Sequence, residues 1–424
     1  MTVQPLSPAR VPIREQALER LRANVRAGYD PFYKMDYAYV RPSPGRYEFM
    51  WFWDTCCHAI AAAKLDPDMA KAELRLLTAT QREDGFIGHV AYWGRWGALQ
   101  SAAFMQSRLG ELRRRHSAMI QPPMLAQAIE AVHAASPDRA FLDTVLPRAQ
   151  AYYDWLARER DFDGSGLIFI ISPWESGMDN SPAFDGPLGL KNPGRMKYLL
   201  RLRVLDWHNL LRGRDFDSKT LLKRNHFVMI DPFVNAIYAD GLRSLARLHA
   251  IAGGGVAAKM AAAQAVKVEA AVDSQCWDAS RGHWVYLSGR EKCPVTVLTA
   301  SSVMPVIMGG VSSAHAAEAV SRHLTNPKEF WTRLPVPSVA ASEPDFDPEG
   351  ESLIWRGPVC MNLNWFFVRG LRGNGYRAEA DHIAARSREA AESSYFREFY
   401  SPDTGRGLRG TNFGWGTLAA AMDG

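Results

Sequence analysis

The sequence predicts an all-α protein in which helical hairpins stack and close into an α/α toroid. Apolar residues recur at helical spacing through much of the chain, as at Leu125, Ile129 and Val132. Asp-Pro pairs at 66–67 and 231–232 are typical of helix starts, because Asp caps the first turn and Pro suits its first position. Strands and helices do not alternate, so a parallel sheet of the Rossmann or TIM type is not expected.

Turns that run from Asp to Gly separate the predicted helices. Asp tolerates turn geometry and Gly supplies the positive φ that such turns need. These turns follow aromatic helix ends at 84–85, 163–167, 278–282 and 403–408. The repeated order of helix, turn and helix favours stacked hairpins.

Short strand-like runs at 167–171 and 284–287 predict small β pieces inside the loops. The Pro-rich stretch 334–348 is interpreted as a long ordered loop, although a domain linker is the alternative. With no long Ser-, Gly- or Pro-rich linker elsewhere, we expect a single domain over residues 1–424.

The composition of the 424 residues excludes several classes of protein. The 50 basic and 45 acidic residues give a net charge of +5, which does not favour nucleic acid. Five cysteines without a CxxC pair indicate reduced thiols in the cytoplasm. The sequence contains no run of about 18 apolar residues, so no membrane-spanning helix is expected. No metal motif such as HExxH occurs, so no metal or cofactor is expected.

One segment departs from this balance of charge. Between residues 191 and 224 the sequence has ten Lys and Arg and three Asp, a local charge of 10 − 3 = +7. The segment is interpreted as a basic lid or insertion-like element with a solvated face. The alternative is an electrostatic clamp for an anionic ligand.

The aromatic content, with 13 Trp, 14 Tyr and 19 Phe, suits a sugar-binding cleft. In one cluster, 47–54, Asp54 follows a run of aromatic residues and must find partners or water if it is buried. In another, 173–182, Glu175 and Asp179 flank Gly177. Two carboxylates that share a partly dry cavity push one pKa up, as a general acid at neutral pH requires. A helix cap and a polar loop are the respective structural alternatives.

Two further clusters lie in the C-terminal third. Arg356 between Trp355 and Gly357 suits a platform that stacks a sugar and binds its hydroxyls, or a structural Arg at a helix end. Glu398 precedes a turn and could reach a cavity, or it is a surface acid at a helix end. Trp415 follows Glu398 further along the sequence.

Taken together, these motifs resemble glycoside hydrolase family 63 and, more loosely, the family 37 trehalases. The resemblance runs from about residue 40 to the C-terminus and rests on five motifs in the family's order. They are Trp53-Asp54, Gln121-Pro122-Pro123, Trp174 to Ser181, Trp355-Arg356-Gly357-Pro358 and Glu398 to Gly405. The resemblance implies an (α/α)6 toroid and inverting hydrolysis of an α-glycoside.

By this resemblance, Asp179 matches the general acid and Glu398 the general base. An inverting enzyme needs one protonated carboxyl at the glycosidic oxygen and one carboxylate that holds water on the opposite face. The resemblance and the aromatic pattern also imply substrate-binding positions: Tyr47, Trp51, Trp53, Asp54, Tyr92, Trp93, Gln121, Glu175, Gly177, Trp355, Arg356, Gly357 and Trp415.

The stretch 330–340 is most similar to the bacterial mannosylglycerate and glucosylglycerate hydrolases. This implies a small, anionic carbohydrate substrate, and it allows a homo-oligomer. The alternatives are an α-glucosidase acting on neutral di- or oligosaccharides, a sugar epimerase, and a non-catalytic sugar-binding toroid. Epimerases of this shape work with histidines, and the eleven histidines form no such motif.

Overall fold

The computed structural model describes residues 12–97, 99–100, 106–107, 115–351 and 353–422. The described part is mostly helical. Its α-helices are α1 (Ile13–Ala23), α2 (Phe52–Ala62), α3 (Pro67–Ala79), α5 (Leu125–Ala135), α6 (Arg139–Arg160), α7 (Arg195–Trp207), α8 (Ser218–Arg224), α9 (Pro232–Ile251), α10 (Gly255–Cys276), α11 (Ala300–Val303), α12 (Ser313–Ala319), α13 (Met361–Gly373) and α14 (Arg377–Ser394).

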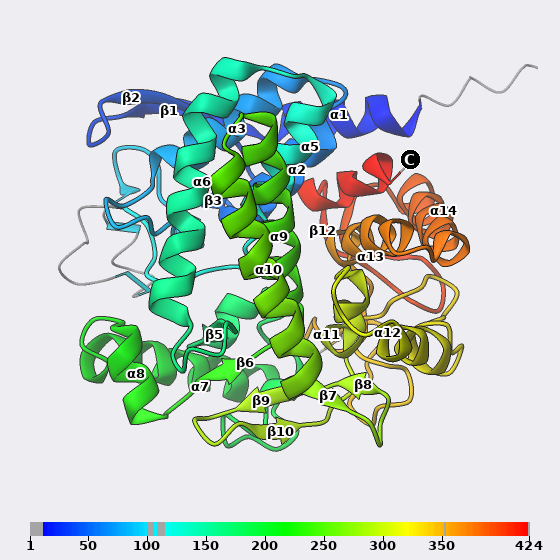
Figure 1. Ribbon diagram of the computed structural model, residues 1–424. Helices are drawn as coiled ribbons and strands as arrows, with labels where there is room; N and C mark the ends of the chain where they lie inside the picture. Colours follow the sequence, from blue (N-terminus) through cyan, green and yellow to red (C-terminus); the bar gives the residue numbers. More distant parts are fainter. Residues whose placement is uncertain (1–11, 98, 101–105, 108–114, 352, 423–424) are drawn as a thin grey trace, which may run out of the picture.

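Consecutive helices pack against each other as hairpins. The pairs are α2 with α3, α5 with α6, α9 with α10, and α13 with α14 (Figure 1). The expected helix starts are confirmed: the Asp66 carboxylate accepts a hydrogen bond from the Met69 amide at 3.1 Å, and that of Asp231 from the Phe233 amide at 2.9 Å. Gly85 turns with φ +101°, and a Cβ there would clash with the Ala151 carbonyl oxygen. This turn therefore requires glycine.

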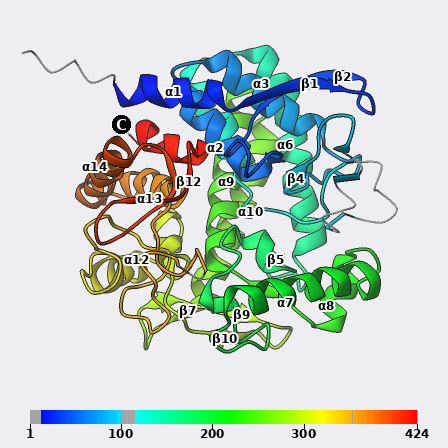
Figure 2. The same cartoon turned by 180° about the vertical axis from the view of Figure 1, so that it is seen from behind.

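The two ends of the described chain meet. Helix α1 packs against the C-terminal 3₁₀ segment Gly414–Ala421, beside α2 and α13 (Figures 1 and 2). The Asn24 side-chain amide donates to the Asn412 carbonyl at 2.8 Å, and the Gly414 amide donates to the Pro42 carbonyl at 2.8 Å. The N-terminal hairpin and the C-terminal turns thus form one wall of the molecule.

The strands are short and lie in the connections between helices. The predicted strand regions fall on β5 and on β8 with β9, while the β1–β2 hairpin (Val25 paired with Val40) was not anticipated. One antiparallel sheet has the order β10-β9-β6-β5. The strands are β1 (Val25–Asp30), β2 (Met35–Val40), β3 (Met50–Trp51), β4 (Val90–Ala91), β5 (Phe169–Ile170), β6 (Met229–Ile230), β7 (Trp277–Asp278), β8 (His283–Trp284), β9 (Tyr286–Ser288), β10 (Cys293–Val295), β11 (Arg397–Tyr400) and β12 (Gly407–Thr411).

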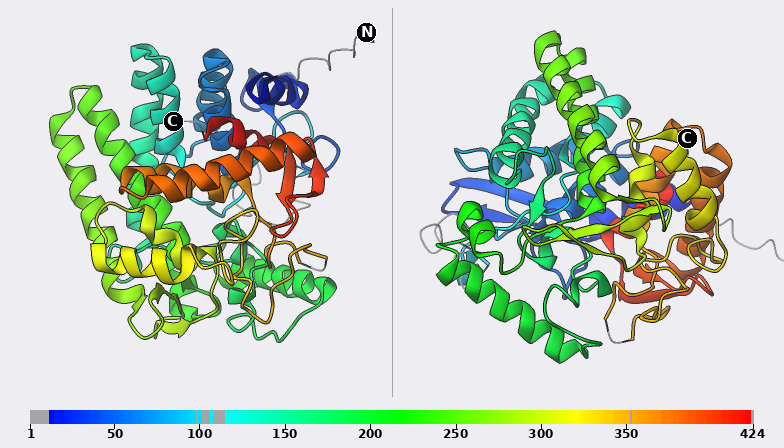
Figure 3. Two further views of the ribbon diagram at one scale, coloured as in Figure 1. Left: turned by 90° about the vertical axis from the view of Figure 1, so that its right-hand side faces the viewer. Right: turned by 60° about the horizontal axis from the view of Figure 1, so that its bottom comes forward.

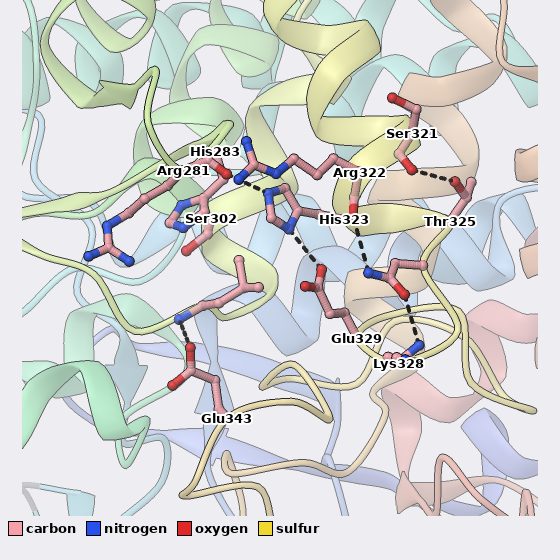
Figure 4. Close-up of polar contacts among 12 residues, drawn as sticks. Arg281, His283, Ser302, Ser321, Arg322, His323, Thr325, Lys328, Glu329 and Glu343 are labelled. Carbon is pink, nitrogen blue, oxygen red and sulfur yellow. Dashed lines mark hydrogen bonds and ion pairs between the residues drawn. The ribbon is translucent and has the colours of Figure 1, made fainter.

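The long connection between α12 and α13 is fixed by partly buried polar contacts (Figure 4). His323 Nε2 donates to the Arg281 carbonyl at 2.8 Å, and its Nδ1 lies 2.7 Å from Glu329 Oε2. Further along, Glu343 Oε1 accepts a hydrogen bond from the Leu298 amide at 2.9 Å. The Pro-rich stretch 334–348 is accordingly an ordered loop whose apolar residues, including Leu334 and Val336, join the hydrophobic core.

None of the helices in the described ranges is long and apolar enough to cross a membrane.

Candidate active site

A cavity of about 250 Å³ collects residues from distant parts of the sequence. Its walls come from the start of α2, from the loop before α5, from the loop after β5, from the loop before α13, and from β11 with the C-terminal 3₁₀ segment. Ten of the predicted site residues line it: Tyr47, Trp51, Trp53, Asp54, Gln121, Gly177, Asp179, Trp355, Glu398 and Trp415.

Asp179 is held in a loop that glycine brings against the aromatic wall. Gly177 has φ +74°, and a Cβ there would lie 2.7 Å from Trp53 Cη2. Asn180 Nδ2 donates to Asp179 Oδ2 at 3.2 Å, and its own Oδ1 accepts from the Trp355 amide at 2.8 Å. Burial raises the pKa of Asp179 to about 7, and the charge of Glu398 acts in the same direction. Asp179 therefore carries a proton in part of the population at neutral pH.

Glu398 faces the same cavity from β11 and is surrounded by donors. Tyr47 donates its hydroxyl to Oε1 at 2.8 Å, and the Gly410 amide donates to Oε2 at 3.1 Å. Arg46 Nη1 lies 3.2 Å from Oε2. Burial and the charge of Glu398 raise the pKa of Tyr47, so its phenol stays a donor. These contacts fix the carboxylate in one orientation, as positioning a water requires.

Asp54 lies at the start of α2, deep in the same cavity. Its Oδ1 is buried and has no hydrogen-bond partner within the described part of the chain, and burial raises its pKa well above the usual range. Trp51 Nε1 is likewise buried without a described partner. Unsatisfied polar atoms on a cavity wall are costly unless a ligand or water meets them. Both residues line the cavity, although these two atoms are themselves covered from solvent.

Glu175, four residues before Asp179, does not line the cavity. Its side chain is fully buried in a bidentate ion pair with Arg160, with N–O distances of 2.6 and 2.7 Å. The same carboxylate accepts from the amides of Ile120 and Ile171, at 2.9 and 2.8 Å. It therefore links the end of α6 to the two loops that present Gln121 and Asp179.

Replacing Arg160 by Met is expected to lower the free energy of unfolding by about 3 to 5 kcal/mol, because it leaves a buried carboxylate without its cation. Urea denaturation measures this. The matched control is Arg158→Met on the same helix, whose exposed pair with Glu159 should change stability by less than about 1 kcal/mol. An equally small loss in the Arg160 variant would contradict the structural role of the pair.

Four other predicted residues also lie outside the cavity lining. Arg356 is buried and pairs with Asp185 at 2.7 Å. A Cβ on Gly357 would clash with the Asp347 carbonyl oxygen, so glycine permits a close backbone approach. Tyr92 and Trp93 are buried behind the wall, where their rings pack on Phe49 and on Tyr33 with Tyr37. From these positions the four residues can support the walls of the cavity.

Sequence reasoning missed several residues that line the cavity. His89 has Nδ1 against Ser117 Oγ, and burial lowers its pKa to about 3, so the imidazole is neutral. Asn180, Arg46 and Arg195 could have been suspected from their neighbours in the motifs or in the basic segment. Pro42, Trp174, Leu199, Leu353, Ile354, Phe399, Arg409 and Phe413 complete the wall.

Only a small part of the basic segment 191–224 lies at this cavity. Arg195 and Leu199, at the start of α7, line the cavity, whereas the other basic residues of 191–224 do not. Among the described residues, no group of three His, Cys, Asp or Glu side chains could hold a metal ion. The cavity lining offers three carboxyl groups, those of Asp54, Asp179 and Glu398, together with several hydrogen-bond donors and an aromatic wall.

Two carboxyl groups that face one aromatic cavity are the arrangement that glycoside hydrolysis uses. Comparison with known families agrees: residues 47–416 match the model described as the mannosylglycerate hydrolase MGH1-like glycoside hydrolase domain. The chain belongs to this family.

Individual relatives are similar over nearly their whole length. Mannosylglycerate hydrolase from Thermus thermophilus is 28% identical, covering 90% of this chain and 96% of the relative. Glucosylglycerate hydrolase from Mycolicibacterium hassiacum is 27% identical, covering 90% and 92%. A crystal structure of the family 63 mannosylglycerate hydrolase from Thermus thermophilus with Tris and D-glycerate superposes with a TM-score of 0.82, at 27% identity over 97% and 99% of the two chains. Neutral trehalase from Saccharomyces cerevisiae, 14% identical with a TM-score of 0.59 over 97% of this chain and 80% of the trehalase, shares the fold.

Proposed function

We propose that this protein hydrolyses an α-glycoside of glycerate, glucosylglycerate or mannosylglycerate, with inversion at the anomeric carbon. The observation that carries the proposal is that Asp179 and Glu398 line one cavity in opposite environments. Asp179 is buried with a pKa raised to about 7, and Glu398 is surrounded by hydrogen-bond donors. The names of the relatives support glycerate as the aglycone.

In the proposed reaction Asp179 gives its proton to the glycosidic oxygen as the bond from that oxygen to the anomeric carbon breaks. Glu398 takes a proton from a water molecule that attacks the anomeric carbon from the opposite face. The products are a β-sugar and free glycerate. This mechanism needs a carboxyl separation of about 6.5–9.5 Å in the complex, which leaves room for the water.

The remaining cavity residues bind the sugar in this proposal. Asp54 and Trp51 contact the sugar from the cavity wall. The rings of Trp53, Trp355 and Trp415 pack on one another at centroid distances of 5.5 to 6.3 Å and exclude water. Glu175 and Arg356 act indirectly, through the loops that they fix.

We further propose that the hairpins form an (α/α)6 ring of one catalytic domain, which the contact between the two chain ends supports. Cytoplasmic location is part of the same proposal. All five cysteines are free thiols, in keeping with a reducing compartment.

The direct test is a product assay by anomeric NMR on glucosylglycerate, mannosylglycerate, trehalose and a set of glucobioses. The proposal expects β-glucose or β-mannose as the first product from a glycerate glycoside. Initial release of the α-anomer would contradict inversion. Preferential turnover of a neutral disaccharide would move the function to an α-glucosidase.

Arg195 is the cation of the basic segment that lines the cavity, so we assign it to the glycerate carboxylate. Replacing it by Gln is expected to raise KM for the glycerate glycoside about tenfold, while KM for the methyl glycoside of the same sugar changes little. Arg212→Gln, from the same segment but outside the cavity lining, is the matched control. Equal changes for both substrates would remove Arg195 from aglycone recognition.

A further inference from the structure

Helix α7 has two apolar faces, and the fold covers one of them. It continues into a π-helical turn, His208–Arg212. Tyr198, Leu202 and Leu205 point inward and are buried. Opposite them a second stripe is exposed, by 80% at Met196, 64% at Leu200, 46% at Val204, 47% at Trp207 and 58% at Leu211.

The spacing of this outer stripe, at four, four, three and four residues, keeps it on one side of the helix. Helical geometry places Arg203 along one border of the stripe and Lys197 and Arg201 along the other. Figure 2 shows α7 and α8 on the outside of the molecule, and the right-hand view of Figure 3 shows this green segment at the edge. A helix that is apolar on both sides is normally covered on both.

Two of the three acidic residues of the segment are engaged by neighbouring groups. Asp206 is buried and accepts from Gln106 at 3.3 Å, with Arg203 Nη1 at 3.9 Å. Asp217 caps α8 by accepting from the Thr220 amide at 2.7 Å. The outer face of α7 is thus an apolar stripe bordered by cations, in a segment with a net charge of +7, from ten basic and three acidic residues.

We propose that the outer face of α7 docks on an anionic lipid surface. Apolar side chains that include Trp, bordered on both sides by Lys and Arg, are the pattern of helices that lie in the plane of a membrane interface. Each cation near an anionic leaflet adds attraction, and the apolar stripe adds burial.

A second copy of the chain fits this face less well. A two-fold interface sets the same patch against itself, so two segments of charge +7 would meet with Arg203 and Lys197 beside like charges. A lipid headgroup layer supplies the opposite charge without such pairing. The inference does not depend on the proposed reaction, since the stripe lies outside the cavity lining.

The experiment is co-sedimentation of the full-length protein with phosphatidylglycerol-rich vesicles and with pure phosphatidylcholine vesicles. We expect binding to the anionic vesicles, little binding to the zwitterionic ones, and loss of binding at high salt. The double variant Leu200→Glu, Trp207→Glu should weaken binding at least about tenfold. Met260→Glu is the matched control, because Met260 is 69% exposed on another helix, α10.

Both substituted side chains are exposed, and circular dichroism checks that the variant is folded. Lys197→Glu tests the electrostatic part separately and should also weaken binding. Failure of the native protein to bind anionic vesicles overturns the proposal, and so does binding that the stripe variant leaves unchanged. A dimer in sedimentation equilibrium that the stripe variant converts to monomer would assign the face to a second copy instead.

Discussion

Replacing Asp179 by Asn is expected to lower kcat for a glycerate glycoside about a thousandfold, because the leaving oxygen then receives no proton in the transition state. The substitution keeps the shape of the side chain, and it removes a group whose burial the fold already tolerates in a protonated form. The variant should therefore fold and bind substrate with little change in KM. Steady-state kinetics on purified protein measure both quantities.

An activated substrate separates the loss of the acid from general damage to the site. Fluoride leaves without protonation, so the Asp179→Asn variant is expected to hydrolyse the corresponding α-glycosyl fluoride within about tenfold of the native rate. Equal loss on both substrates would mean that the variant disturbs the loop. Near-native rates on the glycerate glycoside would remove Asp179 from the mechanism.

The pH dependence follows from the same group. The pKa of Asp179 is raised to about 7, first by burial and then by the charge of Glu398, while Asn180 and the Trp355 indole oppose the shift. The acid form is needed, so kcat/KM should fall as pH rises through about 7. The glycosyl fluoride should lack this alkaline limb. A flat profile above that pH for the glycerate glycoside would contradict the assignment.

Local signals in the sequence predict several of the helices, and the family resemblance predicts much of the cavity lining. Asp66 and Asp231 cap helices as expected, since capping needs only near neighbours. Trp53 at the start of α2, Asp179 in a loop and Glu398 near the start of β11 line the same cavity, although they lie far apart in the sequence.

Contacts between distant segments could not be predicted in the same way. Nothing local to Glu175 indicates that its partner is Arg160 at the end of α6. The motif therefore predicts a substrate-binding carboxylate, whereas in the structure this carboxylate ties loops together. Tyr92 and Trp93 resemble cleft aromatics in the sequence, yet the packing next to β4 buries them behind the cavity wall. The charge pattern predicts the basic segment as one unit, whereas within it Arg195 and Leu199 alone line the cavity.

Replacing Glu398 by Gln is expected to lower kcat about a thousandfold or more, on the glycerate glycoside and on the glycosyl fluoride alike. The attacking water must lose a proton with either substrate, whether the leaving group is glycerate or fluoride. The amide can keep the hydrogen bond from Tyr47 through its oxygen, so the side chain should stay in place. Parallel kinetics on the two substrates provide the measurement.

The contrast between the two variants is what assigns the roles. A fluoride rate that survives at position 179 and disappears at position 398 distinguishes the acid from the base, which neither variant does alone. Tyr47→Phe gives an intermediate control, because it removes one of the donors that orient Glu398 and leaves the carboxylate itself. It should cost about tenfold in kcat on both substrates. If the Glu398 variant kept its activity on the fluoride, the water would be activated elsewhere, and Asp54, buried in the same cavity with an unpaired oxygen, would be the residue to test next.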